Sequence, residues 1–307
     1  MIHPEPYPSK IMLAGEYGVV VGGSALTIPY YRFDAKVREI GDTSAGETRE
    51  AEISQKYLMR LFNYIAGLQP EAFHAKPDLD FFSANLKNYW LEMNIPTGYG
   101  LGSSGAVSAA VYDLFFPGAV GLSLELQRED LAVIESYFHG KSSGVDAITC
   151  HARTPLYFNS NGTVEKKEFD PSAIRGGYRL FLLDSDERFE TGPLVKIFLQ
   201  RMKDNGFASS IRNEYLVINQ KLIESLLGNG DGDPALLIRV LSDYQFTHFR
   251  KMIPERMLDV WIEGQLSNEY YLKLNGSGGG YMLGITHETS MEALSQRWKE
   301  KVTFIQT

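Results

Sequence analysis

Two kinds of apolar pattern alternate along the first half of the chain. Residues 51–67 and 124–138 place apolar side chains at helical spacing, and Ser123 stands where the second helix needs an N-cap. Residues 104–116 form a run of small apolar residues behind a glycine-rich loop, which predicts a third helix. Short apolar or loosely alternating segments predict strands at 10–14, 17–21, 30–39 and 79–93.

The second half is predicted to be mostly helical. The character of the chain changes around residues 170–177, where Pro171 and two glycines precede an apolar run, and this change predicts domains at 1–170 and 171–307. The mixed order of elements indicates an α+β fold rather than a strict β-α-β alternation. Helices are predicted at 192–203, 208–227, 234–249, 255–265 and 289–299, and strands at 271–274, 281–284 and 302–305.

Composition narrows the class of protein. The 307 residues are 44% hydrophobic and 22% charged, which is ordinary for a globular protein. A net charge of −8 disfavours a nucleic-acid partner, because phosphate backbones require a basic surface. No apolar run approaches the ~18–20 residues that span a bilayer. The single Cys150 and the absence of an apolar core in residues 1–10 lead us to expect a cytoplasmic protein without a signal peptide.

The strongest chemical signal is the loop at residues 96–106, which leads directly into a predicted helix. Gly98, Gly100 and Gly102 can adopt positive φ and allow the backbone to approach a ligand closely. Ser103 and Ser104 follow at the helix start, where several N–H groups and the positive dipole end suit a phosphate. The alternative is a flexible loop with a helix cap, but three alternating glycines and two serines exceed what a cap requires.

Two familiar nucleotide motifs do not fit this context. Residues 100–105 match the letters of the dinucleotide fingerprint, but a second helix follows where that motif requires a strand. Residues 140–142 resemble the end of a Walker A loop, but Glu135 occupies the position of its first glycine.

Two carboxylates and a lysine are the candidates for acid–base and metal chemistry. Glu135 lies near the end of a predicted helix and Asp146 follows a compact loop, so one could hold Mg²⁺ while the other orients or deprotonates a hydroxyl. Lys10 enters an apolar strand and requires a partner there, for which Asp146 is a candidate. Each residue also has a structural alternative. Glu135 could be a solvated helix residue, Asp146 could cap a turn, and Lys10 could extend to solvent from a strand edge.

A second glycine-rich segment lies at residues 273–281, between two strand-like runs. It predicts either a linker or a tight turn whose backbone faces a ligand. His139 is interpreted as a structural hydrogen-bonding residue, because the histidines and Cys150 show no metal-ligand spacing.

Together the segments at 10–26, 96–106, 139–146 and 273–280 resemble the GHMP kinases in order and spacing. That resemblance implies a two-lobed α+β fold. The N-terminal domain would be a β-α-β domain with a left-handed crossover, the C-terminal domain would be ferredoxin-like, and the active site would lie between them.

The segment at 139–146 looks most like that of mevalonate kinases, which implies ATP and Mg²⁺ as cofactors and mevalonate as the small-molecule substrate. By this resemblance Asp146 is catalytic with Lys10 beside it, and Ser104 and Glu135 hold Mg²⁺. Glu16, Tyr17, Thr191 and Gly278 would bind substrate. The ATP phosphates would lie on Gly98, Tyr99, Gly100, Leu101, Gly102, Ser103 and Ser104.

The sequence departs from the mevalonate kinase pattern at several positions. Tyr17 replaces a usual histidine and is frequent among phosphomevalonate kinases, and Lys141 and Ser142 replace the usual Asn-Pro. A phosphomevalonate kinase or a sugar kinase is therefore the nearest alternative. A catalytically silent metabolite sensor is a further one, although a sensor needs no base. A homodimer through the long C-terminal helices stays open.

Overall fold

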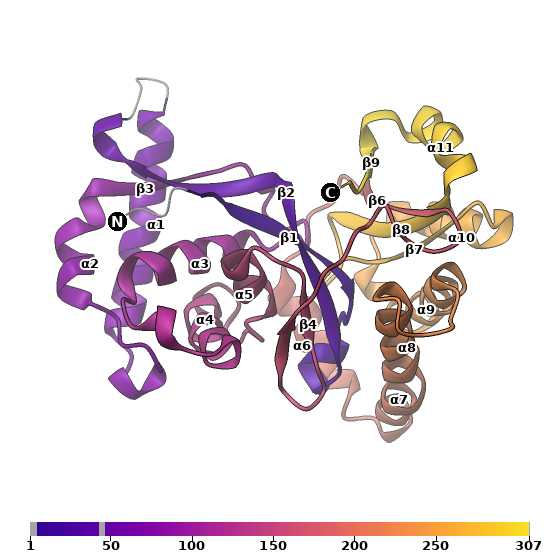
Figure 1. Ribbon diagram of the computed structural model, residues 1–307, viewed down its shortest axis with the longest axis horizontal. Helices are drawn as coiled ribbons and strands as arrows, with labels where there is room; N and C mark the ends of the chain where they lie inside the picture. The colour runs from indigo at the N-terminus through magenta and orange to yellow at the C-terminus, as the bar shows by residue number, and fades with distance from the viewer. Residues whose placement is uncertain (1–4, 43–46, 307) are drawn as a thin grey trace. The chain divides into compact units, whose positions relative to one another are not determined.

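The structure is a computed structural model that describes residues 5–42 and 47–306. The segment at 1–10, for which no signal peptide was predicted, has its residues 1–4 outside the described part. The chain forms two compact units (Figure 1). Unit 1 contains the described residues of 1–10, 29–96 and 102–154, and unit 2 contains 11–28, 97–101 and 155–307. The predicted domain division at residue 170 stays a prediction.

Unit 1 contains a cluster of helices and residues of three strands. The end of β2 pairs with β3 in antiparallel register, with Val37 opposite Leu91. Helices α3 and α5 pack side by side (Figure 1). The elements with residues in unit 1 are β1 (Tyr7–Ala14), β2 (Ala25–Glu39), α1 (Thr48–Ala66), α2 (Leu79–Asn85), β3 (Tyr89–Met93), α3 (Ser103–Phe115), α4 (Leu124–His139) and α5 (Val145–Ala152).

Unit 2 contains the remaining elements, and β1 and β2 each contribute residues to both units. The start of β2 pairs with β4, and β4 pairs with β5, both in antiparallel register. The elements that follow unit 1 in the chain are β4 (Leu156–Phe158), β5 (Val164–Lys166), β6 (Tyr178–Asp184), α6 (Thr191–Arg201), α7 (Asn205–Ser210), α8 (Leu216–Leu226), α9 (Pro234–His248), α10 (Leu258–Ser267), β7 (Tyr270–Leu274), β8 (Tyr281–His287), α11 (Met291–Trp298) and β9 (Val302–Phe304).

The larger sheet of unit 2 has the strand order β7-β8-β6-β9, and every described pair in it is antiparallel. Helices separate β6 from β7 and β8 from β9, whereas β7 and β8 are consecutive. This β-α-β-β-α-β order is that of a ferredoxin-like fold. The expected ferredoxin-like C-terminal part is therefore confirmed, and so is the mixed α+β class.

One predicted strand, at 17–21, is wrong, and another, at 79–93, is confirmed only over its last residues. Residues 18–21 form a 3-10 turn, because Gly15, Tyr17 and Gly22 all adopt positive φ and turn the chain back on itself. Residues 79–85 form helix α2, and only 89–93 extend as β3. The Asp78 carboxylate caps α2 by accepting from the N–H of Phe81.

A second unpredicted helix, α5, carries a predicted site residue. Residues 139–146 were expected to be a tight polar segment, but α5 begins at Val145, so Asp146 lies in its first turn. Gly144 permits this start, because it adopts a φ of 72° and a Cβ there would lie 2.3 Å from the carbonyl oxygen of Arg128.

Among the described residues, no helix has both the length and the apolar character needed to cross a membrane.

Candidate active site

The predicted phosphate loop has the backbone geometry that its glycines allow. Gly98, Gly100 and Gly102 have φ values of 80°, 72° and 75°, in the left-handed region that favours glycine. Helix α3 begins at Ser103, and the preceding Gly102 has no side chain to cap the first N–H groups. These groups and the positive end of the helix dipole are thus available to an anion.

Lys10 and Asp146 form an ion pair within unit 1. The Lys10 Nζ lies 3.0 Å from Asp146 Oδ1, and the lysine side chain is 1% exposed whereas the aspartate side chain is 30% exposed. Gly102 allows this approach, because a Cβ there would lie 2.9 Å from the Lys10 Cγ. Within residues 5–42 and 47–306, the Lys10 Nζ has no acceptor beyond this carboxylate. The buried ammonium group therefore keeps donors for a further anion.

Ser104 and Glu135, the predicted metal ligands, are also in contact. The Ser104 hydroxyl donates to Glu135 Oε1 at 2.9 Å, and the same hydroxyl lies 2.9 Å from His139 Nε2. The Ser142 hydroxyl donates to the other oxygen of Glu135 at 2.5 Å. His139 and Ser142 thus belong to the surroundings of Glu135. The sequence predicted a structural hydrogen-bonding role for His139 and no site role for Ser142.

The donor set fits Mg²⁺ bound together with a phosphate. Burial raises the pKa of Glu135 to about 7, and the nearby charge of Asp146 acts in the same direction. A buried carboxylate of this kind is stabilised in its charged form by a divalent cation. The described residues contain no cluster of three or more histidine, cysteine or acidic side chains that could hold a metal alone. Mg²⁺ does not require such a cluster, because phosphate oxygens and water complete its coordination.

In unit 2, the first half of the phosphate loop packs directly on the second glycine-rich segment. A Cβ at Gly100 would lie 2.3 Å from the carbonyl oxygen of Asn275, and a Cβ at Gly280 would lie 2.1 Å from the Cα of Tyr99. The Asn275 amide donates to the Gly100 carbonyl at 3.3 Å, and the Tyr281 N–H donates to the Tyr99 carbonyl at 3.4 Å. The segment is therefore a tight turn between β7 and β8, as one of the two predictions had it, and not a linker.

Glu16 is buried in an ion pair that the sequence did not predict. Its side chain and that of Lys273 are both 0% exposed, and the Lys273 ammonium donates to Glu16 Oε1 and to the carbonyls of Met12 and Leu274. A lysine inside the apolar strand 271–274 was the available signal, since the argument applied to Lys10 holds equally for Lys273.

Tyr17, Thr191 and Gly278 also lie in unit 2. The buried Tyr17 hydroxyl donates to the Ser277 carbonyl at 2.5 Å, and the Ser277 hydroxyl donates to Thr191 Oγ1 at 3.1 Å. Gly278 packs against Met252, whose carbonyl oxygen would lie 2.3 Å from a Cβ. The substrate roles of these residues and of Glu16 stay predictions.

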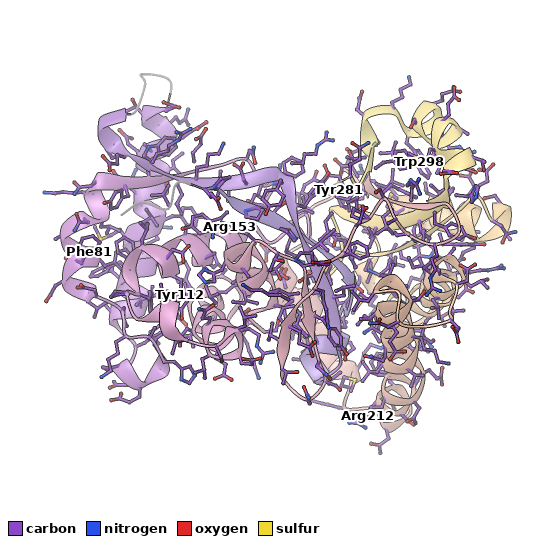
Figure 2. The ribbon with its side chains drawn as sticks, in the orientation of Figure 1. Phe81, Tyr112, Arg153, Arg212, Tyr281 and Trp298 are labelled. Carbon is purple, nitrogen blue, oxygen red and sulfur yellow. The ribbon has the colours of Figure 1, made fainter. Side chains whose placement is uncertain are left out.

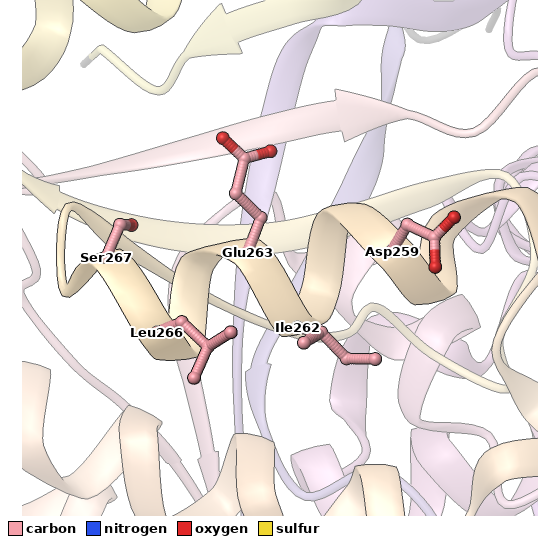
Figure 3. A pocket seen from close by; sticks show the side chains of 5 residues that line it. All are labelled: Asp259, Ile262, Glu263, Leu266 and Ser267. Atoms are coloured by element: carbon pink, nitrogen blue, oxygen red, sulfur yellow. The ribbon is translucent and has the colours of Figure 1, made fainter.

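The predicted residues thus fall into two groups, one in each unit. Unit 1 holds the catalytic pair and the metal-ligand pair, whereas unit 2 holds the first half of the phosphate loop and the predicted substrate residues. A surface hollow along α10 contains none of them (Figure 3). It is lined by Asp259, Ile262, Glu263, Leu266 and Ser267.

Comparison with known proteins identifies the fold. Residues 60–152 match the GHMP kinases N terminal domain. The chain is similar to the structure of Methanococcus jannaschii mevalonate kinase, with 18% identity, a TM-score of 0.62, and coverage of 99% of this chain and 97% of that one. No curated protein matches the chain in sequence.

Structures with other acceptors are equally similar. Streptococcus pneumoniae phosphomevalonate kinase in complex with phosphomevalonate and AMPPNP has 15% identity, a TM-score of 0.61, and coverage of 98% and 99%. Lactococcus lactis galactokinase complexed with galactose has 13% identity, a TM-score of 0.61, and coverage of 98% and 92%. The resemblance to the GHMP kinases is therefore confirmed, and identities this low show the fold alone.

Proposed function

We propose that this chain, which has the fold of the GHMP kinases, is an ATP-dependent kinase that transfers the γ-phosphoryl group to a primary hydroxyl. The observation that carries the proposal is the Lys10–Asp146 pair beside the uncapped start of α3. A carboxylate that is 30% exposed remains accessible to an acceptor, and its lysine is buried with donors to spare. A structural ion pair would require neither feature.

In the proposed mechanism, the residues of unit 1 position charge and take up a proton. Asp146 orients the acceptor hydroxyl and accepts its proton as the oxygen attacks the γ-phosphorus. The bond from this phosphorus to the β,γ-bridging oxygen breaks in the same step, and ADP leaves. Lys10 stabilises the negative charge that develops beside it. The N–H groups of Ser103 and Ser104 bind phosphate oxygens, and Ser104 and Glu135 would hold Mg²⁺, which neutralises phosphate charge when bound.

We further propose mevalonate as the acceptor. The support is the resemblance of residues 139–146 to mevalonate kinases, together with the structural similarity described above. The test is ADP release with ATP and Mg²⁺ across mevalonate, phosphomevalonate, galactose and homoserine. We expect fast turnover on mevalonate alone. Turnover on another member of the panel would replace the acceptor, and absence of turnover on all four would contradict the kinase proposal for these acceptors.

Phosphomevalonate is the second candidate, because a cation lies next to the phosphate loop. The guanidinium of the exposed Arg188 lies 5.8 Å from the ring centre of Tyr99. A Cβ added at Gly98 would lie 3.3 Å from the Cβ of Arg188. Arg188→Met separates the two candidates. If the guanidinium binds an acceptor phosphate, the variant loses turnover of phosphomevalonate selectively. If it binds ATP, KM for ATP rises with every acceptor.

A further inference from the structure

A cluster of charged and polar side chains lies in unit 1 outside the predicted site, and its centre is the carboxylate of Asp113. The Tyr7 hydroxyl donates to Asp113 Oδ2 at 2.9 Å, and His151 Nδ1 lies 3.0 Å from Oδ1. The Arg153 guanidinium lies 3.6 Å from Oδ2, stacks over the ring of Tyr7 at 4.4 Å and donates to the carbonyl of Pro6 at 3.1 Å.

The cluster is largely shielded from water, so its interactions are not those of a solvated surface pair. The side chains of Asp113, His151 and Arg153 are 17%, 15% and 14% exposed, and Tyr7 is fully buried. Burial would raise the pKa of Asp113, but His151, Tyr7 and Arg153 outweigh it and hold that pKa below its ordinary value. The carboxylate is therefore charged and firmly held.

The side chains of this cluster connect three elements, and each element also carries a residue of the predicted site. The cluster lies away from the predicted site residues. Asp113 is nine residues beyond Ser104 on α3, or roughly 14 Å along the helix axis at the rise of an α-helix. Tyr7 precedes Lys10 on β1, Asp113 follows Ser104 on α3, and His151 follows Asp146 on α5.

Close packing holds the same three elements at the site itself. A Cβ at Gly105 would lie 2.8 Å from the carbonyl carbon of Asp146, so the start of α3 touches the start of α5. The Lys10 side chain passes equally close to Gly102. Packing at one end and the Asp113 cluster at the other fix both the separation and the tilt of these elements, which packing at one point cannot do.

We infer that Asp113 is a positioning residue, which fixes α5 and β1 against α3 and thereby sets the geometry of the Lys10–Asp146 pair. The inference rests on the proposed kinase function. A displacement of about 1 Å between reacting groups lowers a rate by about a hundredfold, so a positioning residue can affect kcat without touching substrate.

The test compares two aspartates of unit 1, the largely shielded Asp113 and the fully buried Asp130. Asp113→Asn keeps the volume of the side chain and removes the charge. Asp130→Asn is the matched control, because Asp130 also accepts from a tyrosine hydroxyl, that of Tyr112 at 2.7 Å. It otherwise accepts from the N–H groups of His74 and Ala75 and contacts neither β1 nor α5 in any described hydrogen bond. Tyr112 and Arg153 mark the two clusters in Figure 2.

Two readouts distinguish positioning from general support of the fold. We expect Asp113→Asn to lower kcat per folded molecule about 10- to 100-fold with KM for ATP nearly unchanged. Hydrogen exchange of the amides of α5 should accelerate in the same variant. Asp130→Asn should accelerate exchange near residues 74 and 75 and leave kcat unchanged.

Equal kcat in the two variants, or unchanged exchange in α5, would overturn the inference. Tyr7→Phe, which removes only the hydroxyl, provides the same test if Asp113→Asn does not fold. If the wild-type protein turns over no acceptor, the proposed function fails. The exchange of α5 then decides the inference alone: acceleration in Asp113→Asn supports the link between α3 and α5, and unchanged exchange overturns it.

Discussion

Lys10 and Lys273 are both buried lysines that pair with a carboxylate, one in each unit, and the two pairs differ in what their remaining atoms contact. The Lys273 ammonium is shared among Glu16 and two backbone carbonyls, and both side chains of the pair are 0% exposed. Lys10 has only Asp146 as an acceptor within the described residues, and the aspartate is 30% exposed. In the first pair the ammonium group has three acceptors and neither side chain reaches water, whereas the second pair has capacity for a ligand.

This difference has a physical consequence for each pair. Removing one member of a fully buried pair leaves an isolated charge without water, and that is costly to the fold. Replacing Lys10 is cheaper for the fold, because solvent screens the partly exposed Asp146 carboxylate that remains. Asp146→Asn leaves Lys10 buried, but the new amide oxygen can still accept a hydrogen bond from its ammonium group. We therefore expect substitutions at the Lys273 pair to act on stability and substitutions at the Lys10 pair to act on the reaction.

The largest effect is expected for Asp146→Asn. The variant keeps the shape of the side chain but cannot accept the proton of the acceptor hydroxyl, so kcat should fall about 10²- to 10⁴-fold with little change in ATP affinity. Steady-state kinetics and nucleotide titration measure the two quantities. Turnover near the wild-type rate would show that Asp146 is not the base. The expectation that the Lys10–Asp146 pair acts on the reaction would then be wrong.

Lys273→Met should lower the free energy of unfolding by about 3–5 kcal/mol, because Glu16 is left charged and buried. Denaturant unfolding measures the change. The double variant Glu16→Gln/Lys273→Met is the control, and it should recover much of the loss because no buried charge remains. If the single variant unfolds like the wild type, the two pairs do not differ in the way described.

Gly100→Ala tests the unit 2 part of the phosphate loop. The new Cβ would lie 2.3 Å from the Asn275 carbonyl at a φ of 72°, so the loop must shift. We expect KM for ATP to rise about tenfold, which corresponds to about 1.4 kcal/mol. Gly228→Ala is the matched control, because Gly228 has a φ of 75° and nothing within 4 Å of a Cβ. A similar KM in both variants would mean that the loop geometry does not matter for ATP.

The smallest effect is expected for Tyr17→Phe, which removes the hydroxyl that donates to the Ser277 carbonyl. The part-buried Ser277 carbonyl would lose this donor, which should cost stability at the low end of about 1–3 kcal/mol. Because the Tyr17 ring packs on Phe198 and Phe249, we expect kcat and KM for the acceptor to be unchanged. A raised KM for the acceptor would instead support the substrate role that the sequence predicted.

Local patterns determined most of the elements. The glycines and serines of residues 98–104 and the caps Ser123 and Asp233 act within a few residues, and the loop, α3, α4 and α9 follow from them. The strand predicted at 79–93 failed for a local reason, because the Asp78 cap that starts α2 was not recognised. The strand at 17–21 failed because positive φ at the non-glycine Tyr17 leaves little trace in sequence.

Tertiary structure alone decided which of the distant charged and polar side chains contact one another. Lys273 is 257 residues from Glu16, and Tyr7 is 106 residues from Asp113. Each of these side chains has several possible partners of opposite charge or matching polarity in the sequence. The choice is made by strand and helix packing, which brings one partner close and excludes water from it. Spacing and residue type therefore predicted a phosphate loop and a candidate lysine–carboxylate pair, and the resemblance to the GHMP kinases implied a catalytic role for that pair. Only the fold showed that a second lysine–carboxylate pair is fully buried, and that the Asp113 cluster connects the three elements that carry Lys10, Ser104 and Asp146.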